Sequence, residues 1–491
     1  MVVAGASGMK QEDRKEILWF GGNPPESLIL ELKQRGDLMV NAISEAKLEE
    51  LAPFSRGVII EFNDDQDLFL AKVRHACDAV LNHGLIIILV HREEWQLTSL
   101  AELLNGSLDL TTDYVIPVYG IENWAVVAEK VARHNPGPGA NFSLRIDGIG
   151  DLDRQMSLLL SRAFSDFDKI YLERLGGGFS HAQVFTVLPS RTRGKAFPRP
   201  MPYLAKIDTL DRIKQEEANY TQYVADYVPF NHRPNLDFSR SAYGKELAVF
   251  VEDFIERAIP LRDALPVGNA STLIASLFDS ALRGWRLCVE LDNVPVVTRF
   301  KDLKVLRRSD ALEQSARLAK QQYGTSIDVD TLMNLLDSVG LIKCLQCTIH
   351  GDLHSANIFI VGGSTQAVLI DFYKTQLGPA VADPACLEVD LAFNVNPSFD
   401  QDFLLDVYKY PLTAPDFGVR QSGHDTLWEA LRTIRLFGCS GEVGCYAYVI
   451  AVVSYLIRFA SYEDNESSHR ALTYFIAQDL AQKVYNDIAG S

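Results

Sequence analysis

Short apolar runs alternate with segments of helical spacing along the first 135 residues. The run Leu85–Val90 (LIIILV) is apolar throughout, as expected of a strand that is covered on both faces. Such alternation is typical of a parallel sheet with helices on both sides. The pattern predicts an α/β domain over residues 16–135 with a five-stranded parallel sheet, after an N-terminal tail at 1–15. The predicted strands are 17–20, 38–40, 57–62, 85–90 and 114–119, and the predicted helices are 27–35, 45–52, the segment around 70–81, and 124–132.

The segment His134–Asn141 (HNPGPGAN) separates this domain from the rest of the chain. Its two prolines and two glycines favour turns and interrupt both helices and strands. We therefore expect a domain boundary there, with a linker at residues 136–150. Strand-like runs follow first, and helical periodicity comes later. The strand-like runs are 171–175, 183–187, 203–207 and 247–254, and the helical segments are 212–223, 270–284, 309–322, 399–409, 425–437, 443–461 and 467–487.

Polar residues gather around one predicted β-hairpin, formed by the runs Ile358–Val361 and Ala367–Ile370. Asp352 and Asn357 precede the first strand, and Asp371 follows the second. Folding the hairpin is expected to bring Asn357 and Asp371 to the same end, facing Asp352. This set suits phosphoryl transfer, with Asp352 accepting the proton of an attacking hydroxyl. Asn357 and Asp371 offer the hard oxygen ligands that Mg²⁺ prefers beside nucleotide phosphates.

The two segments HGDLHSAN (350–357) and IDF (370–372) resemble the HGDxHxxN and IDF pattern of aminoglycoside phosphotransferases and choline kinases. These families are relatives of the protein kinases. The resemblance implies an α+β bilobal, protein kinase-like domain with ATP and Mg²⁺ as cofactors. Its N-lobe is expected at 151–256 and its mostly helical C-lobe at 257–491. It also implies that Asp352 is the general base and that Asn357 and Asp371 bind the metal.

The expected N-lobe contains a glycine-rich turn and a lysine in an apolar strand. Glycines let backbone N–H groups approach phosphates closely, although a plain turn has the same signature. Lys206 lies in the run Tyr203–Ile207, where an ammonium group needs a partner. By resemblance, Lys206 binds the α- and β-phosphates. The residues expected to cover the phosphates are Gly176, Gly177, Gly178, Phe179 and Ser180.

The helix predicted after Lys206 offers two glutamates as partners for that lysine. Glu216 lies four residues before Tyr220, on the face expected to point inward, and is the preferred partner. Glu217 is the alternative, and an ordinary solvated acid is a third interpretation for either.

The strand predicted at 247–254 is expected to lead into the hinge between the two lobes. By resemblance, an adenine ring contacts backbone groups there. Glu252 and Phe254 are the residues that we assign to this part of the nucleotide site.

Two departures argue against a eukaryotic-type protein kinase. Gly351 stands where those enzymes have the arginine of HRD, and Tyr373 follows Asp371-Phe372 where they have glycine. Regulation by activation-loop phosphorylation is therefore disfavoured. Three acids follow downstream: Asp383 and Asp390 are expected to support the catalytic turn, and Glu388 is considered as a group that faces a substrate.

The N-terminal domain resembles the receiver domains of two-component signalling, which have a flavodoxin-like fold. Glu61 stands where receivers have the phosphoacceptor aspartate, and Ile116 where they have a lysine before Pro117. Where receivers have paired acids after the first strand, this chain has Gly21, Gly22 and Asn23. We therefore expect a module that is not phosphorylated and that serves regulation, partner binding or dimerisation. Another small α/β sensor domain is the alternative.

Composition limits the environment and the partners of the chain. The 491 residues carry a formal net charge of −17, which disfavours broad binding to nucleic acid or to anionic membranes. No secretory signal is apparent, and the longest apolar run, Cys445–Ile457, is too short to span a bilayer. Seven cysteines fit free thiols in a reducing cytoplasm. We therefore expect a cytoplasmic protein that does not bind membranes.

Two functions from different classes remain open from the sequence. The first is an ATP- and Mg²⁺-dependent phosphotransferase that acts on a hydroxyl of a small molecule or a protein. The second is a nucleotide-binding regulatory or scaffold pseudokinase of a bacterial signalling or conflict system, in which the N-terminal domain binds a partner. The sequence does not identify the acceptor.

Overall fold

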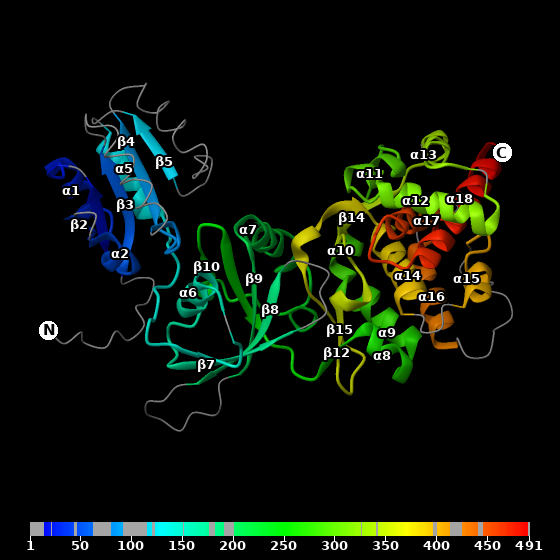
Figure 1. Ribbon diagram of the computed structural model, residues 1–491, viewed down its shortest axis with the longest axis horizontal. Helices are drawn as coiled ribbons and strands as arrows, with labels where there is room; N and C mark the ends of the chain where they lie inside the picture. The colour runs from blue at the N-terminus through cyan, green and yellow to red at the C-terminus, as the bar shows by residue number, and fades with distance from the viewer. Residues whose placement is uncertain are drawn as a thin grey trace. The chain divides into compact units, whose positions relative to one another are not determined.

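The structure is a computed structural model of the chain (Figure 1). It divides into two compact units: one runs to Lys214 and includes Asn235–Phe254, and the other consists of Gln215–Pro234 and the chain from Ile255 onward. The structure describes residues 14–20, 22–43, 47–61, 80–91, 115–119, 123–150, 152–175, 182–190, 201–325, 327–339, 342–395, 400–412, 425–439 and 445–489.

The first unit begins with a five-stranded sheet in the order β2-β1-β3-β4-β5, in which all neighbouring strands are parallel. This is the flavodoxin-like strand order. Trp19 and Trp124 meet in its core with their ring centroids 5.8 Å apart. Of the helix predicted around 70–81, only Val80 and Leu81 lie within the described residues. The elements are β1 (Glu16–Phe20), α1 (Glu26–Gln34), β2 (Met39–Ala42), α2 (Leu48–Leu51), β3 (Ser55–Glu61), β4 (Ile86–His91), β5 (Val115–Tyr119) and α5 (Trp124–Arg133).

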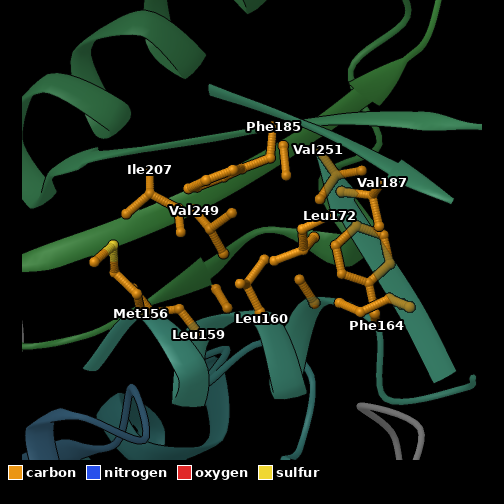
Figure 2. Close-up of a cluster of buried hydrophobic side chains, with 14 of the residues drawn as sticks. Met156, Leu159, Leu160, Phe164, Leu172, Phe185, Val187, Ile207, Val249 and Val251 are labelled. Carbon is orange, nitrogen blue, oxygen red and sulfur yellow. The ribbon is translucent and has the colours of Figure 1, made fainter. Parts of the chain in front are cut away.

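A second sheet of the first unit has the order β10-β11-β9-β8-β7-β6. Its pairs are antiparallel except β6 with β7. Helix α6 (Arg154–Ala163) covers one face, and Figure 2 shows Met156, Leu160 and Phe164 packed against Phe185 and Val249 of the strands. The strands are β6 (Arg145–Asp147), β7 (Lys169–Arg174), β8 (Gln183–Ser190), β9 (Tyr203–Thr209), β10 (Ala242–Tyr243) and β11 (Leu247–Asp253).

Part of the segment between the two sheets, where the sequence predicts a linker, is buried. Residues 136–139 are buried, and the carbonyls of this segment accept hydrogen bonds from a buried arginine. Arg162 of α6 is fully buried. Its guanidinium donates to the carbonyl oxygens of Pro136, Pro138, Asn82 and Tyr243, at 2.6–3.1 Å.

Helix α7 (Leu210–Asn219) crosses from the first unit into the second and continues into a π-helical turn at Tyr220–Val224. The second unit is mostly helical (Figure 1). Its helices are α8 (Leu261–Ala264), α9 (Ala270–Ser276), α10 (Arg283–Leu287), α11 (Val296–Asp302), α12 (Asp310–Tyr323), α13 (Val329–Ser338), α14 (Ala382–Asn394), α15 (Gln401–Val407), α16 (Asp425–Gly438), α17 (Tyr446–Ala460) and α18 (Ser467–Ala489).

Local chemistry explains where several of these helices begin and end. The Ser309 hydroxyl accepts a hydrogen bond from the Leu312 N–H, as an N-cap does at the start of α12. Gly324 then ends α12 in the left-handed conformation, at φ 69°. Helix α17 is almost wholly apolar and buried. In the part of the chain that the structure describes, no helix has the length and apolar character of a membrane span.

Two small sheets complete the second unit. One has the order β12-β15-β16 and the other β13-β14-β17. Both are antiparallel, and they flank the turn that contains Asp352. Their strands are β12 (Ala258–Pro260), β13 (Glu290–Leu291), β14 (Leu345–Ile349), β15 (Ile358–Val361), β16 (Ala367–Leu369) and β17 (Gln376–Pro379).

Candidate active site

The hairpin of β15 and β16 brings Asn357 and Asp371 to one end. Ile358 is opposite Leu369 in the register, and the Ile370 N–H donates to the Asn357 carbonyl at 3.1 Å. Asp371 therefore follows directly on the residue that pairs with Asn357. This is the arrangement that the sequence predicts, and β15 has the predicted bounds.

The turn before the hairpin requires glycine at position 351. Gly351 has φ +78°, and a Cβ there would lie 2.4 Å from the Lys374 carbonyl oxygen. The Asp383 carboxylate, which is buried, accepts hydrogen bonds from the N–H groups of His350 at 2.7 Å and of Gly351 at 3.0 Å. Burial raises the pKa of Asp383 although these bonds oppose the shift. The predicted support of the turn by Asp383 is confirmed.

Asp390 supports the same turn from helix α14. Its carboxylate accepts a hydrogen bond from the Ser355 N–H at 2.7 Å and another from the Asn394 amide at 2.8 Å. The supporting role predicted for Asp390 is therefore also confirmed. Both acids bind backbone N–H groups that have no partner within a helix or sheet, which fixes the path of the turn.

Asn357 and Asp371 present oxygen atoms of the kind that Mg²⁺ prefers. The Asn357 amide nitrogen donates to the Asp352 carbonyl at 3.0 Å, so its amide oxygen is the atom left to accept a ligand. Asp371 adopts a left-handed backbone conformation, at φ 63°, which is uncommon outside glycine and is often found at functional sites. The described residues contain no cluster of three or more acidic, histidine or cysteine ligands. The pair suits Mg²⁺ that is bound mainly through phosphates and water.

Asp352 lies between two cations. Its Oδ2 accepts from the Lys374 ammonium at 2.8 Å, and its Oδ1 accepts from the Arg458 guanidinium at 2.7 Å. Burial alone would raise the pKa of Asp352, but Arg458 and Lys374 outweigh it and hold the pKa well below the usual range. The carboxylate is therefore ionised at neutral pH, as a proton acceptor must be. Burial lowers the pKa of the neighbouring His354, although Asp352 opposes this shift.

Lys374 and Arg458 are the polar residues of this site that our sequence analysis did not assign. Arg458 is the only charged residue of α17, a helix that is otherwise apolar or uncharged. An isolated arginine in such a helix must find a partner, by the same reasoning that singled out Lys206. Lys374 gives no comparable signal, because it lies in a polar segment.

Glu216 contacts the IDF segment within the second unit. Its Oε1 accepts a hydrogen bond from the Phe372 N–H at 3.1 Å, and its side chain is buried. Asn219 donates from its amide to the carbonyls of Phe372 and Tyr373, at 3.0 Å and 2.7 Å. Glu217 is buried as well. The assignment of Glu216 as the partner of the lysine stays a prediction.

Lys206 lies in β9 of the first unit. It is buried, and its Nζ is 5.8 Å from the centre of the Phe250 ring. Val184 of β8 and Phe250 of β11 are its neighbours across the sheet. The predicted glycine-rich turn before β8, with Gly176, Gly177, Gly178, Phe179 and Ser180, lies outside the described residues.

The predicted adenine segment lies at the end of β11. Glu252 is buried and is paired with Leu204 in the sheet. The Asp253 N–H donates to the Asn235 carbonyl at 3.0 Å, so this group is not available to a ligand. The chain passes from the first unit to the second between Phe254 and Ile255.

Glu388 does not face a substrate, and that hypothesis is wrong. The side chain is completely buried and is bound by the Arg435 guanidinium, with the closest contact at 2.7 Å. The Tyr448 hydroxyl donates a further hydrogen bond at 2.5 Å. A buried carboxylate needs such partners, and here they come from α16 and α17. The sequence does not show that these helices pack against α14.

Comparison with known proteins gives one match by sequence family. Residues 292–411 match the model of the phosphotransferase enzyme family. This stretch contains Asp352, Asn357 and Asp371, and it amounts to less than half of the chain. A search of curated proteins found no match.

Several solved kinase structures resemble part of the chain. An ethanolamine kinase from Plasmodium vivax is 14% identical, with 63% of this chain and 82% of that chain covered and a TM-score of 0.32. The ADP-bound aminoglycoside phosphotransferase APH(2'')-Ib is 14% identical, with 64% and 93% covered and a TM-score of 0.33. The aminoglycoside phosphotransferase APH(3'')-Id from Streptomyces rimosus is 16% identical, with 54% and 92% covered and a TM-score of 0.29. TM-scores this low carry no conclusion about fold, so the family match is the finding that supports a phosphotransferase.

Proposed function

We propose that the protein is an ATP- and Mg²⁺-dependent phosphotransferase that transfers the γ-phosphate of ATP to a hydroxyl acceptor. The observation that carries this proposal is the geometry of one turn and hairpin. There, Asp352, whose carboxylate is bound by Lys374 and Arg458, lies beside the end of the hairpin at which Asn357 and Asp371 lie. The match of residues 292–411 to the phosphotransferase family supports the same reaction.

The proposed roles follow the chemistry of each side chain. The hydroxyl oxygen of the acceptor attacks the γ-phosphorus of ATP, and ADP leaves on the opposite side. Asp352 accepts the proton of this hydroxyl during the attack. Asn357 and Asp371 would hold Mg²⁺, which would neutralise charge on the phosphates. Lys206, with Glu216 as its partner, would bind the α- and β-phosphates. The residues proposed to complete the nucleotide site are Gly176, Gly177, Gly178, Phe179, Ser180, Glu252 and Phe254.

A transfer assay with Asp352→Asn tests this function. Asparagine keeps the size of the side chain but is not a base at neutral pH. We expect transfer to fall by about a hundredfold or more, because a positioned base contributes on the order of 10²–10⁴-fold. Nucleotide affinity should stay within about threefold of wild type, which also shows that the variant folds. Equal transfer by wild type and variant would contradict the assignment of Asp352.

A nucleotide-binding scaffold is the second candidate. The observation that favours it is that both oxygens of Asp352 bind cations, which restricts approach of a hydroxyl. A scaffold would bind ATP in stoichiometric amounts without turnover with any acceptor. Steady turnover that is lost in Asp352→Asn excludes this candidate, since binding alone does not consume ATP.

We further propose that the N-terminal domain is a receiver-like module without phosphoacceptor chemistry, which serves regulation or dimerisation. The flavodoxin-like strand order supports this interpretation. Glu61 is the last residue of β3 and is buried. A glutamate at this position lacks the aspartyl chemistry of receivers, so acetyl phosphate should not label the domain.

A further inference from the structure

We infer that the acceptor carries an anionic group, a carboxylate or a phosphate, beside the hydroxyl that is phosphorylated. Lys374 and Arg458 would bind this group next to Asp352. The inference rests on the proposed function and names the acceptor class of that same site.

The two cations lie where the acceptor must approach. Lys374 binds one oxygen of Asp352 at 2.8 Å and Arg458 binds the other at 2.7 Å. The Asp352 side chain is only 18% exposed, so little of the carboxylate is accessible apart from these contacts. A hydroxyl within hydrogen-bond distance of Asp352 is therefore also close to both positive charges.

The nearby acids have partners of their own, although Asp390 keeps its negative charge because its partners are neutral donors. Asp383 and Asp390 accept hydrogen bonds from backbone N–H groups of the turn, and Glu388 is neutralised by Arg435. Asp371 is assigned to the metal and the nucleotide phosphates. Within the set of Asp352, Lys374 and Arg458 the net charge is +1, so a group that binds Lys374 and Arg458 directly is favoured when it is an anion.

Lys374 has donors to offer to such an anion. Its side chain is 43% exposed, and its ammonium has three N–H donors, one of which binds Asp352. The half-exposed side chain can turn its other donors toward a carboxylate or phosphate. Charge-assisted bonds of this type are stronger than bonds between neutral groups.

Arg458 is held in a fixed orientation. Its Nε donates to the Tyr462 hydroxyl at 2.6 Å, and its guanidinium lies 5.8 Å from the ring centres of both Tyr455 and Tyr462. Burial would lower the pKa of Arg458, but Asp352 outweighs it and keeps the group charged. A planar guanidinium fixed in this way suits a carboxylate or phosphate geometrically.

The cations could instead serve the γ-phosphate of ATP, and kinetics distinguish the two roles. Transfer of phosphate from ATP is measured with three sets of alcohols. The anionic set contains hydroxy acids and sugar phosphates, the neutral set contains sugars and polyols, and the cationic set contains amino alcohols and aminoglycosides. We expect transfer to the anionic set.

For Lys374→Gln, the KM of the acceptor should rise by about tenfold to a hundredfold, while the KM of ATP stays within about twofold. Lys301→Gln is the matched control, because Lys301 is 42% exposed and also pairs with an aspartate.

Three results would overturn the inference. Transfer to cationic or neutral alcohols in preference to anionic ones would do so, as would a rise in the KM of ATP equal to that of the acceptor. So would the absence of transfer to the whole anionic set in an enzyme that binds nucleotide and phosphorylates another alcohol. If the wild-type protein does not bind nucleotide, the proposed function itself is refuted. Failure of the inference and failure of the proposed function are therefore distinguishable.

Discussion

Gly351 shows how a single residue determines the shape of the catalytic turn. A Cβ at this position would meet the backbone oxygen of Lys374, which cannot rotate away as a side chain would. An alanine in the left-handed backbone conformation costs about 1–2 kcal/mol by itself. Because of the added contact, we expect Gly351→Ala to lower the free energy of unfolding by more than this amount. Urea denaturation measures the difference.

Gly363 provides the matched control for that substitution. It has φ +76°, close to that of Gly351, but no atom lies within 4 Å of the position that a Cβ would take there. Gly363→Ala should therefore lower stability only by the conformational cost. Equal losses for the two variants would show that the contact with Lys374 is not a constraint.

At the residue scale, the sequence predicts how Asp352, Asn357 and Asp371 lie relative to one another, but it does not single out Lys374, which follows soon after Asp371. These three residues fall within one turn and the hairpin that follows it, so their spacing determines their relative positions. Arg458 reaches Asp352 from a helix about 100 residues later. No local pattern contains such a pairing, because it depends on how α17 packs.

At the scale of elements, a buried network joins three helices of the second unit. Glu388 of α14 binds Arg435 of α16 and Tyr448 of α17. We expect Glu388→Gln and Arg435→Met each to lower the free energy of unfolding by about 3–5 kcal/mol, because each leaves a buried charge without its partner. Chemical denaturation of both single variants and of the double variant measures this.

The double variant decides whether the pair acts as a unit. Its loss of stability should be smaller than the sum of the single losses by about 1 kcal/mol or more, since the second change removes the charge that the first left unpaired. Strictly additive losses would show that Glu388 and Arg435 do not depend on each other.

Periodicity predicts the long helices α12, α16, α17 and α18 and the hairpin of β15 and β16, but not helices α11, α13 and α14 or the short strands of the two small sheets. It also misses irregular features. The segment expected as one helix at 212–223 is α7 followed by a π-helical turn at Tyr220–Val224. There the Tyr220 ring contacts Phe372, with ring centroids 6.0 Å apart. The change from α-helical to π-helical geometry therefore occurs where the helix contacts the distant segment around Phe372, which local helix propensity does not reveal.

At the scale of the whole molecule, the buried His83 and the half-buried His134 lie where the two sheets of the first unit are joined. Burial, together with Arg162 and Arg14, lowers the pKa of His83 to about 3. Burial also lowers the pKa of His134 to about 4, although its hydrogen bond to the Gly84 carbonyl opposes the shift. Both residues are therefore neutral in the folded state at pH values at which the unfolded chain is protonated.

This difference predicts a loss of stability in acid. The folded pKa values lie below the unfolded value of about 6.5, so the stabilisation is complete above that pH and declines as the pH falls toward 4. Each histidine contributes about 1.4 kcal/mol per pH unit in this window. Urea denaturation of wild type and His83→Gln at about pH 7.5 and about pH 5 should show a smaller pH dependence for the variant. An unchanged dependence would contradict the pKa assignment.

Prolines and glycines at 134–141 reveal a break between elements, but not that residues 136–139 are buried. The carbonyls of this segment are satisfied by Arg162, which is contributed by α6. Turn chemistry is local and readable from sequence, whereas the arginine that binds these carbonyls is identified only by the fold.

The most direct test of the central claim is calorimetric titration of ATP, with and without MgCl₂, on wild type and Asp371→Ala. The account predicts that Mg²⁺ strengthens binding to wild type by about tenfold or more and that the variant loses this gain. Asp337→Ala is the control, because Asp337 is exposed and pairs with Lys301. Binding that is independent of Mg²⁺ in wild type, or that is unaffected by Asp371→Ala, would contradict a nucleotide–metal site at this hairpin.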